Sequence, residues 1–418
     1  MGRPVDSSAS NEISESFGFS QTVLQPEVQP ASAGSSGPDA QAILEAPPKA
    51  PLGILKKLEH HSFSGFGFNT IFRPHSTNKK TPTGLNAPQG PNDNILQLNL
   101  TKDVIKFDFR LGAVPNRGLF GQADINLNGV PYTQKIFDLM DPEVEKPLIH
   151  FENGIWLHVP ETTTPALPPS LARMASIPHG TTINAQSFSA PITSEGAPDI
   201  KPISITPFLI TDPTNLIPFP SQKADNKNTF RLPQDLTPFT KAETVTQEMI
   251  TNPNVVLTNA NKGKEIIEHT TYTISTSPPE SKLGGGTSNI GFLNGDGSQG
   301  DGTPATDNTP RANANAVKVT ATYWISTVRT KLQLKPFTPT MEEPTRTFSP
   351  TAFRPNDAVP VFTVDFKIPS AKEVTVEYTQ FQYSQTVFLD FATLSWPHAT
   401  VGTLAPTDLK LKHSVLRQ

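Results

Sequence analysis

The stretch Val317-Lys-Val-Thr-Ala-Thr-Tyr-Trp-Ile-Ser-Thr-Val328 alternates between two kinds of side chain. Its odd-numbered positions from Val317 to Ile325 are apolar, whereas Lys, Thr, Trp and Ser stand between them. Successive side chains of a β-strand point to opposite faces, so this alternation predicts an antiparallel strand with one buried face. A helix would repeat its apolar positions every three or four residues instead.

The same alternation recurs along most of the chain. It is clear in Ile95-Leu-Gln-Leu-Asn-Leu-Thr and in the run where Ile105, Phe107, Phe109 and Leu111 share a face. Further runs lie at 149–159, 171–177, 183–188, 265–275, 316–328, 361–368, 373–381, 384–394 and 398–404. Only residues 235–262 read as helical. About ten or more strands with so little helix predict a mainly β fold, a barrel or a sandwich. We expect a large antiparallel β-barrel with long loops and a short helical insertion.

A tight turn is expected at Asn128-Gly129, because both residue types adopt positive φ and Leu127 and Val130 flank them. The turn would make 123–136 a hairpin. We further expect 95–100, 104–111 and 123–136 to be consecutive neighbours in the sheet.

The ends and one internal segment differ in composition from the alternating core. Residues 1–50 are rich in Ser, Pro, Ala, Gly and Gln, with few apolar neighbours, and predict a disordered leader. Many glycines at 278–315 predict a flexible insertion. One β domain is therefore expected over 52–413.

Composition excludes several classes of function. The 418 residues contain no cysteine, which excludes disulfides, thiolate zinc sites and cysteine nucleophiles. A net charge of −4 argues against non-specific electrostatic binding to nucleic acid. No apolar run is long enough for a transmembrane helix, and the first residues lack a secretory apolar segment. We therefore expect a cytoplasmic protein that binds neither nucleic acid nor membrane.

The nine histidines are the main candidates for metal binding or acid–base chemistry. His150 and His158 share a strand face, but lie about 26 Å apart on a straight strand and cannot bind one metal unless the strand bends at Gly154. His179 and His398 each follow a proline, which fixes the backbone and holds the imidazole in a defined direction. Each could act as a general base or an axial metal ligand, or could simply bond nearby backbone groups.

The other polar and aromatic residues give fewer indications. The strand acids Asp108, Asp365 and Asp390 occur singly, and we expect each on a solvated face. An aromatic-rich barrel wall can line a ligand cavity or form a packed core. Trp156, Trp324 and Trp396 each lie in a predicted strand, where a core role or a pocket role is open.

The segment Leu58-Glu-His-His-Ser-Phe-Ser-Gly-Phe-Gly-Phe-Asn-Thr-Ile-Phe-Arg-Pro resembles the start of calycin-type, lipocalin-like barrels. Its glycines would allow a bend or close strand approach. With His150-Phe-Glu-Asn-Gly-Ile-Trp-Leu, Arg173-Met-Ala-Ser-Ile-Pro-His-Gly-Thr and Ser395-Trp-Pro-His-Ala-Thr-Val, it resembles nitrobindin-like heme-binding β-barrels and poorly characterised microbial proteins labelled heme-binding. The resemblance implies heme as cofactor, with His398 at the position of the iron ligand.

Three functions stay open on these residues. The first is a barrel that binds an apolar small molecule, with heme as one such ligand and His398 or His179 as its axial ligand. Trp156, Trp324 and Trp396 would then lie near it. The second is a cofactor-free isomerase, cyclase or dehydratase of a hydrophobic metabolite, with Arg173, His179 or His398 in acid–base roles. The third is a structural or assembly protein. The oligomeric state is left open.

Overall fold

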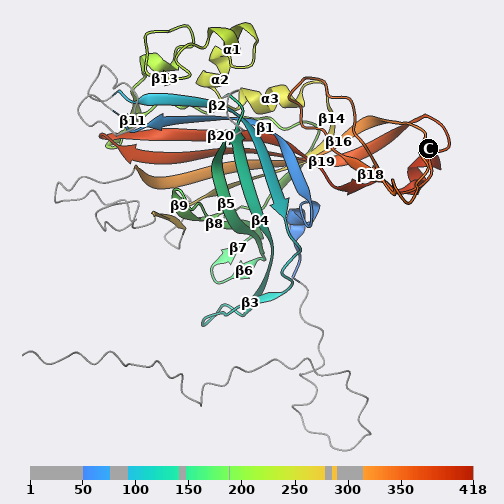
Figure 1. Cartoon of the computed structure of the whole chain (residues 1–418). Coiled ribbons are helices and arrows are strands. Elements are labelled where there is room, and N and C mark those ends of the chain that lie inside the picture. The colour runs from blue at the N-terminus through green and yellow to red at the C-terminus, as the bar shows by residue number, and fades with distance from the viewer. Residues whose placement is uncertain are drawn as a thin grey trace, which may run out of the picture. The chain divides into compact units, whose positions relative to one another are not determined.

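A computed structural model describes residues 50–75, 93–140, 147–187, 189–277, 285–289 and 314–417. Ten strands of these residues form a closed antiparallel barrel (Figure 1). In barrel order they are β1 (Ser62–Arg73), β2 (Ile95–Phe107), β4 (Ile125–Asp138), β5 (Leu148–Val159), β8 (Ser170–Ser176), β9 (Thr181–Gln186), β14 (Glu265–Ser275), β16 (Asn315–Leu334), β19 (Lys372–Phe391) and β20 (Leu394–Pro406). The barrel closes where β20 pairs with β1. The predicted antiparallel β-barrel is confirmed.

The remaining described elements are short. They are the strands β3 (Val114–Asn116), β6 (Thr162–Thr163), β7 (Ala166–Leu167), β10 (Ile192–Glu195), β11 (Phe208–Leu209), β12 (Asp212–Leu216), β13 (Arg231–Leu232), β15 (Gly286–Asn289), β17 (Arg346–Phe348), β18 (Phe362–Val364) and β21 (Leu409–Lys410). The helices are α1 (Thr237–Lys241), α2 (Gln247–Thr251) and α3 (Val255–Asn261), with 3-10 turns η1 (Gly53–Lys57), η2 (Pro220–Gln222) and η3 (His413–Arg417). The helices fall inside the predicted helical region. No helix of the described residues is both long and apolar enough to span a bilayer.

Two glycines let β1 close the barrel against β20. A Cβ on Gly65 would lie 1.9 Å from the carbonyl oxygen of Thr403, and one on Gly67 would lie 2.1 Å from that of Val401. Real Cβ atoms essentially never approach backbone so closely. The glycines of the first strand therefore permit close strand approach, as predicted.

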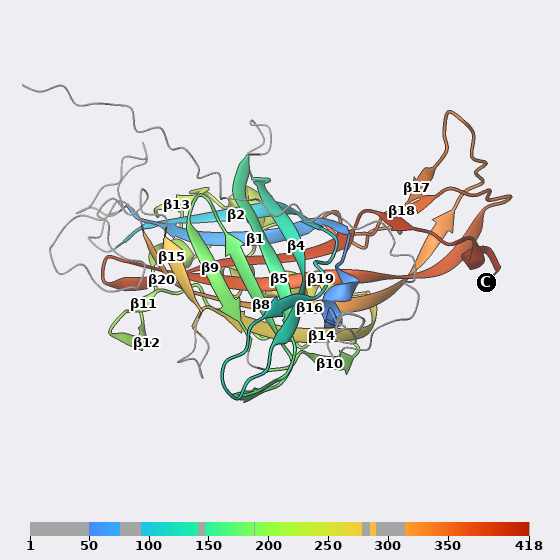
Figure 2. The ribbon, with the colours of Figure 1, turned by 90° about the horizontal axis from the view of Figure 1, so that it is seen from below.

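One end of the barrel, where β1 begins, is filled with apolar side chains; we call it the lower end. Leu55 of η1 and the flanking Leu52 and Leu58 are buried there. They join an aromatic cluster of inward-facing strand residues: Phe63, Phe107, Tyr132, Trp156, Tyr272, Tyr323, Phe381 and Tyr383. Figure 2 shows β4, β5, β8 and β9 crossing the longer strands at a steep angle on one side of the barrel.

Two further apolar clusters lie outside the barrel wall. The segment that carries α1, α2 and α3 covers the outer face of β1, β2 and β20 (Figure 1). Phe68 of β1, Trp396 of β20 and Trp324 of β16 are buried in this cluster. Strands β16 and β19 are 20 residues each and extend beyond the lower end of the barrel. There they pack with the small sheet β17–β18–β21.

The Asn128-Gly129 turn prediction is wrong. Both residues lie inside β4 and pair with His158 and Leu157 of β5. The Asn128 side chain donates to the carbonyl oxygen of Ala50 and accepts from Gly112 N–H, so it serves tertiary contacts instead of a turn. A Cβ on Gly129 would meet the Trp156 carbonyl oxygen at 2.3 Å, which explains the glycine by close strand approach.

The predicted neighbours are only partly correct. Residues 95–100 and 104–107 form one continuous strand, β2, which pairs with β4. Residues 1–49 of the predicted leader at 1–50 lie outside the described residues. So does most of the predicted insertion at 278–315, of which residues 286–289 form β15 beside β9. A single domain over 52–413 stays a prediction.

Candidate functional site

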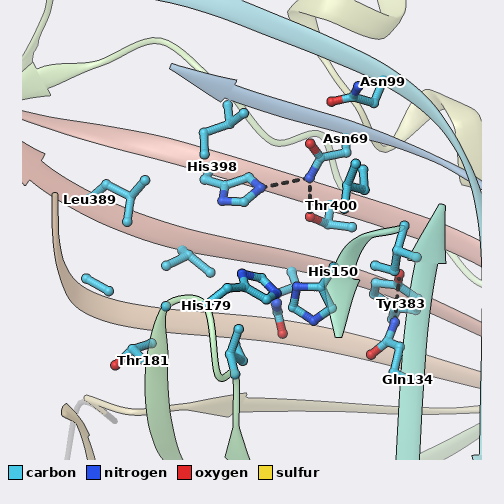
Figure 3. A pocket seen from close by; sticks show the side chains of 18 of the residues that line it. Asn69, Asn99, Gln134, His150, His179, Thr181, Tyr383, Leu389, His398 and Thr400 are labelled. Carbon is cyan, nitrogen blue, oxygen red and sulfur yellow. Dashed lines mark hydrogen bonds between the residues drawn. The ribbon is translucent and has the colours of Figure 1, made fainter. Parts of the chain in front are cut away.

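The upper half of the barrel, toward the end where β1 finishes, contains a cavity of about 600 Å³ (Figure 3). Inward-facing residues of nine strands line it, because every second side chain of each strand points into the barrel. Its wall combines apolar residues, including Ile71, Ile136, Val387 and Leu389, with amides, imidazoles and phenols. The rim is formed by the strand ends and loops at Arg73, Pro74, Ile149, Gly180 and Ala314.

One partner of a buried ion pair, Arg173, forms part of the cavity floor. Arg173 of β8 donates from Nη2 to Glu152 of β5, and both side chains are almost fully buried. Its other nitrogens donate to Tyr132 Oη at 2.8 Å, Tyr323 Oη at 2.5 Å and Gln385 Oε1 at 2.7 Å. The guanidinium is therefore held by four neighbouring side chains of the barrel interior.

The charges of this pair stabilise each other. Burial alone would raise the pKa of Glu152, but the charge of Arg173, together with His150 and Tyr132, lowers it to about 2. Burial disfavours the charged form of Arg173, yet Glu152 keeps the pKa of the guanidinium well above its usual range. Both groups are ionised at neutral pH.

A second buried carboxylate, Asp103, forms no ion pair with an arginine or lysine of the described ranges, unlike Glu152. Asp103 of β2 is 1% exposed, and its Oδ2 accepts from Tyr383 Oη at 2.6 Å and from Gln134 Nε2 at 2.9 Å. Its Oδ1 has no hydrogen-bond partner among the described residues. Burial without a cation partner raises the pKa of Asp103 to about 6.

His398 of β20 faces the cavity beside Asn69 of β1 (Figure 3). The Asn69 amide donates to His398 Nε2 at 2.7 Å and to Thr400 Oγ1 at 2.8 Å. Burial lowers the pKa of His398 to about 3, with the charges of His150 and His179 adding to the effect. His398 is therefore a neutral imidazole whose Nε2 accepts a hydrogen bond.

His150 and His179 lie side by side on another part of the wall (Figure 3). Their rings are nearly perpendicular, with centroids 5.0 Å apart. His150 Nε2 is 3.3 Å from Oε2 of the ionised Glu152, so the imidazole donates to the carboxylate. The backbone N–H of Phe151 donates to His179 Nε2 at 3.1 Å, and burial lowers the pKa of His179.

The structure brings four of the six predicted site residues to this cavity: Trp156, Arg173, His179 and His398. It does not bring Trp324 and Trp396 there, because both are buried in the cluster outside the barrel wall. Trp396 donates its Nε1–H to the Phe391 carbonyl at 2.9 Å. Of the three strand acids expected on solvated faces, Asp108 and Asp365 are exposed, whereas Asp390 is half-buried.

Sequence reasoning missed two buried carboxylates, Asp103 and Glu152, and considered the half-buried His150 only as a metal-binding partner of His158. Their spacing from residues expected on a buried face could have predicted that they point inward. Asp103 is two residues before Ile105, which was expected on a buried face, and Glu152 lies between His150 and Trp156 at the same spacing. Every second residue shares a face, so each of these groups could have been placed inside.

The predicted heme ligands do not fit iron binding through Nε2. That atom of His398 accepts from Asn69, and that of His179 accepts from Phe151 N–H. A nitrogen whose lone pair accepts a hydrogen bond has none left for a metal. Among the described residues, no group of three or more His, Asp or Glu side chains is arranged to hold a metal ion either.

A scan against protein-family models and searches of curated proteins and of solved structures found no match to this chain. The cavity and its chemistry are therefore the features that indicate a function.

Proposed function

We propose that the barrel binds a small organic molecule in its upper half. The observation that carries this proposal is the cavity of about 600 Å³, partly enclosed by the strands and lined by both apolar and polar side chains. Ligand cavities typically hold a few hundred to about 1,000 Å³ and place a few polar groups among apolar walls. This cavity has both properties.

The lining favours a ligand with an apolar body and at least one polar group. Ile71, Ile136 and Leu389 offer apolar surface, whereas Asn69, Asn99 and His398 offer hydrogen-bonding groups. Burying the polar side chains against a purely apolar molecule would leave any unpaired groups without water, which costs about 1–3 kcal/mol for each. A ligand with matching polar atoms avoids this cost.

The first experiment looks for a ligand that accompanies the protein. Native mass spectrometry of the purified chain, followed by analysis of an organic extract, would give the mass of a bound molecule. Ala316 lines the cavity, so Ala316→Trp should fill it and remove the extra mass. Thr273→Trp, on the exposed outer face of β14, is the matched control and should keep it. Retention of the molecule by Ala316→Trp would contradict the proposal.

Heme stays a prediction that hemin titration tests. If hemin binds through His398, a saturable absorbance band near 400 nm should appear and should shift or vanish in His398→Ala. His413→Ala, outside the barrel, should behave like the parent. The hydrogen bond from Asn69 must break before His398 Nε2 could reach iron. No saturable hemin binding by the parent protein would rule heme out.

Catalysis on the bound molecule is the second candidate function. It is favoured by two carboxylates whose environments push their pKa values apart, to about 6 for Asp103 and about 2 for Glu152. Such separation is typical of acid–base sites in enzymes. Glu152 also accepts a hydrogen bond from His150, which lines the cavity and would be the acid or base that reaches the bound molecule. Conversion of an excess of the extracted molecule, lost in His150→Ala while binding persists, would support catalysis.

A further inference from the structure

The rim of the cavity carries a guanidinium with few partners. Arg73 is the last residue of β1 and points inward with Asn69 and Ile71, at two-residue spacing. Its Nη1 donates one long hydrogen bond, 3.5 Å, to Gln97 Oε1. Among the described residues it forms no ion pair. Most of its five donors are thus available to another group.

Arg173, the other arginine of the cavity, is less available to a ligand than Arg73. Arg173 lies deeper and its donors are engaged by Glu152, Tyr132, Tyr323 and Gln385. An anion entering the cavity would have to displace Glu152 to reach it, and the buried glutamate would then lose its counter-ion. No carboxylate of the described residues pairs with Arg73, so the rim is the favourable place for a ligand's negative charge.

Gln97 adds a second donor beside Arg73. It lies on β2 opposite Ile71 and also lines the cavity. Its Oε1 accepts from Arg73, which leaves its amide N–H groups to donate. Two adjacent donors on neighbouring strands match the two oxygens of a carboxylate. The apolar side chains of Ile71, Ile149 and Leu389 also line the cavity and would contact the carbon skeleton attached to that group.

We infer that the ligand is an organic acid whose carboxylate binds Arg73 and Gln97 at the rim while its apolar body fills the cavity. This inference rests on the proposed binding function and specifies its ligand class. An arginine fork binds a carboxylate with charge-assisted, directional hydrogen bonds, which a neutral alcohol cannot reproduce. The barrel should therefore prefer an acid over the alcohol with the same carbon skeleton.

Matched probe pairs test this preference. Isothermal titration with 1-naphthaleneacetate and 2-(1-naphthyl)ethanol compares an aromatic acid with its alcohol, and decanoate with decanol extends the comparison to an aliphatic chain. We expect the parent protein to bind the acid of at least one pair about tenfold more tightly than its alcohol. Arg73→Gln should abolish that preference and leave the alcohol's affinity unchanged. Arg73→Lys, which keeps the charge without the planar fork, should retain part of it.

Arg117→Gln is the matched control, since Arg117 is exposed and pairs with Asp124 away from the cavity. It should keep the full preference. Equal affinity of the parent for acid and alcohol, or a preference that survives in Arg73→Gln, would overturn the organic-acid inference while leaving the binding function intact. If no probe binds the parent, the organic-acid inference is contradicted, while the native mass spectra of the parent and of Ala316→Trp decide the binding function independently. Unfolding curves of each variant establish that it is folded.

Discussion

The lower and upper halves of the barrel are built from the same strands but are filled differently. In the lower half, Leu55, Phe63 and Phe107 are at most 1% exposed and pack with other aromatic side chains. In the upper half, the same strands turn Asn69, Gln97 and His398 toward a cavity. Strand alternation decides which side chains point inward, whereas their size and polarity decide whether the interior is filled.

Strand β1 contains this difference within twelve residues. Its inward positions run from Phe63 through Gly65 and Gly67 to Asn69, Ile71 and Arg73. A large aromatic residue fills the lower end, two glycines bring β20 close, and polar and charged residues face the upper cavity. The lower half should therefore carry stability, and the upper half should carry recognition. The buried pair of Arg173 and Glu152, which lies between the two halves, should contribute to both stability and recognition.

The largest effect is expected at that pair. Glu152→Gln keeps the shape of the side chain but leaves the buried guanidinium of Arg173 without its counter-ion. Removing one partner of a buried ion pair costs about 3–5 kcal/mol. We expect the free energy of unfolding in urea to fall by this amount at pH 7.

A double variant separates the lost charge from lost packing. Glu152→Leu with Arg173→Met removes both charges and should recover at least half of the loss, since apolar replacements of buried pairs are often tolerated. A loss below about 1 kcal/mol in Glu152→Gln would show that solvent, and not the protein, compensates Arg173.

The second-largest effect is the difference in unfolding free energy between a leucine truncated in the lower half and one truncated in the upper half. Leu55 is fully buried in the lower cluster, so Leu55→Ala should cost about 3 kcal/mol through lost burial and a new void. Leu389 lines the upper cavity, which already exists, so Leu389→Ala should cost about 1 kcal/mol. Urea denaturation of both variants measures the difference. Equal losses would mean that the upper half contributes to stability as much as the lower half.

The fold was largely predictable because alternation is a local property. The spacing correctly indicated the buried face of Ile105 and Phe107, but β2 ends at Phe107, and Phe109 and Leu111, expected on the same face, are exposed. Strands also begin near residues 316 and 373, as expected. The prediction failed where tertiary contacts override a local preference. Asn128-Gly129 has the composition of a turn, but Ala50, Gly112 and the close approach of β5 hold it inside β4.

The candidate site was predictable only in part. Prolines drew attention to His179 and His398, which do line the cavity. Trp324 shows the limit of that reasoning. Its strand was recognised, but it was expected near the ligand, because residue type alone could not show that a segment with three helices covers its face of the strand. Likewise, nothing local reveals that Glu152 meets an arginine from the next strand, because the pairing of strands brings them together.

The third effect is a pH dependence of stability that Asp103 should produce between pH 4 and 6, where Glu152 stays ionised. Burial raises the pKa of Asp103 to about 6 from the ordinary 3.8, so between these values the folded protein holds a proton that the unfolded chain has lost. Stability should therefore fall as pH rises from about 4 to 6 and stay low above it. The shift corresponds to about 3 kcal/mol.

Asp103→Asn should remove this decline and raise the free energy of unfolding at pH 7 relative to the parent. Its amide oxygen can still accept from Tyr383 and Gln134. The comparison is made by urea denaturation of parent and variant at several pH values between 4 and 8. Parallel curves for the two proteins would show that Asp103 is not protonated preferentially in the folded state.

The smallest effect is expected at the rim. Arg73 is partly exposed and makes one long hydrogen bond to Gln97, so its removal neither opens a void nor strands a buried charge. Arg73→Gln should change the free energy of unfolding by less than about 0.5 kcal/mol, as for most surface substitutions. A loss above 1 kcal/mol would assign Arg73 a structural role in the upper half. With stability unchanged, any altered preference between the matched acid and alcohol probes comes from recognition itself, because the same folded barrel is compared with and without its rim guanidinium.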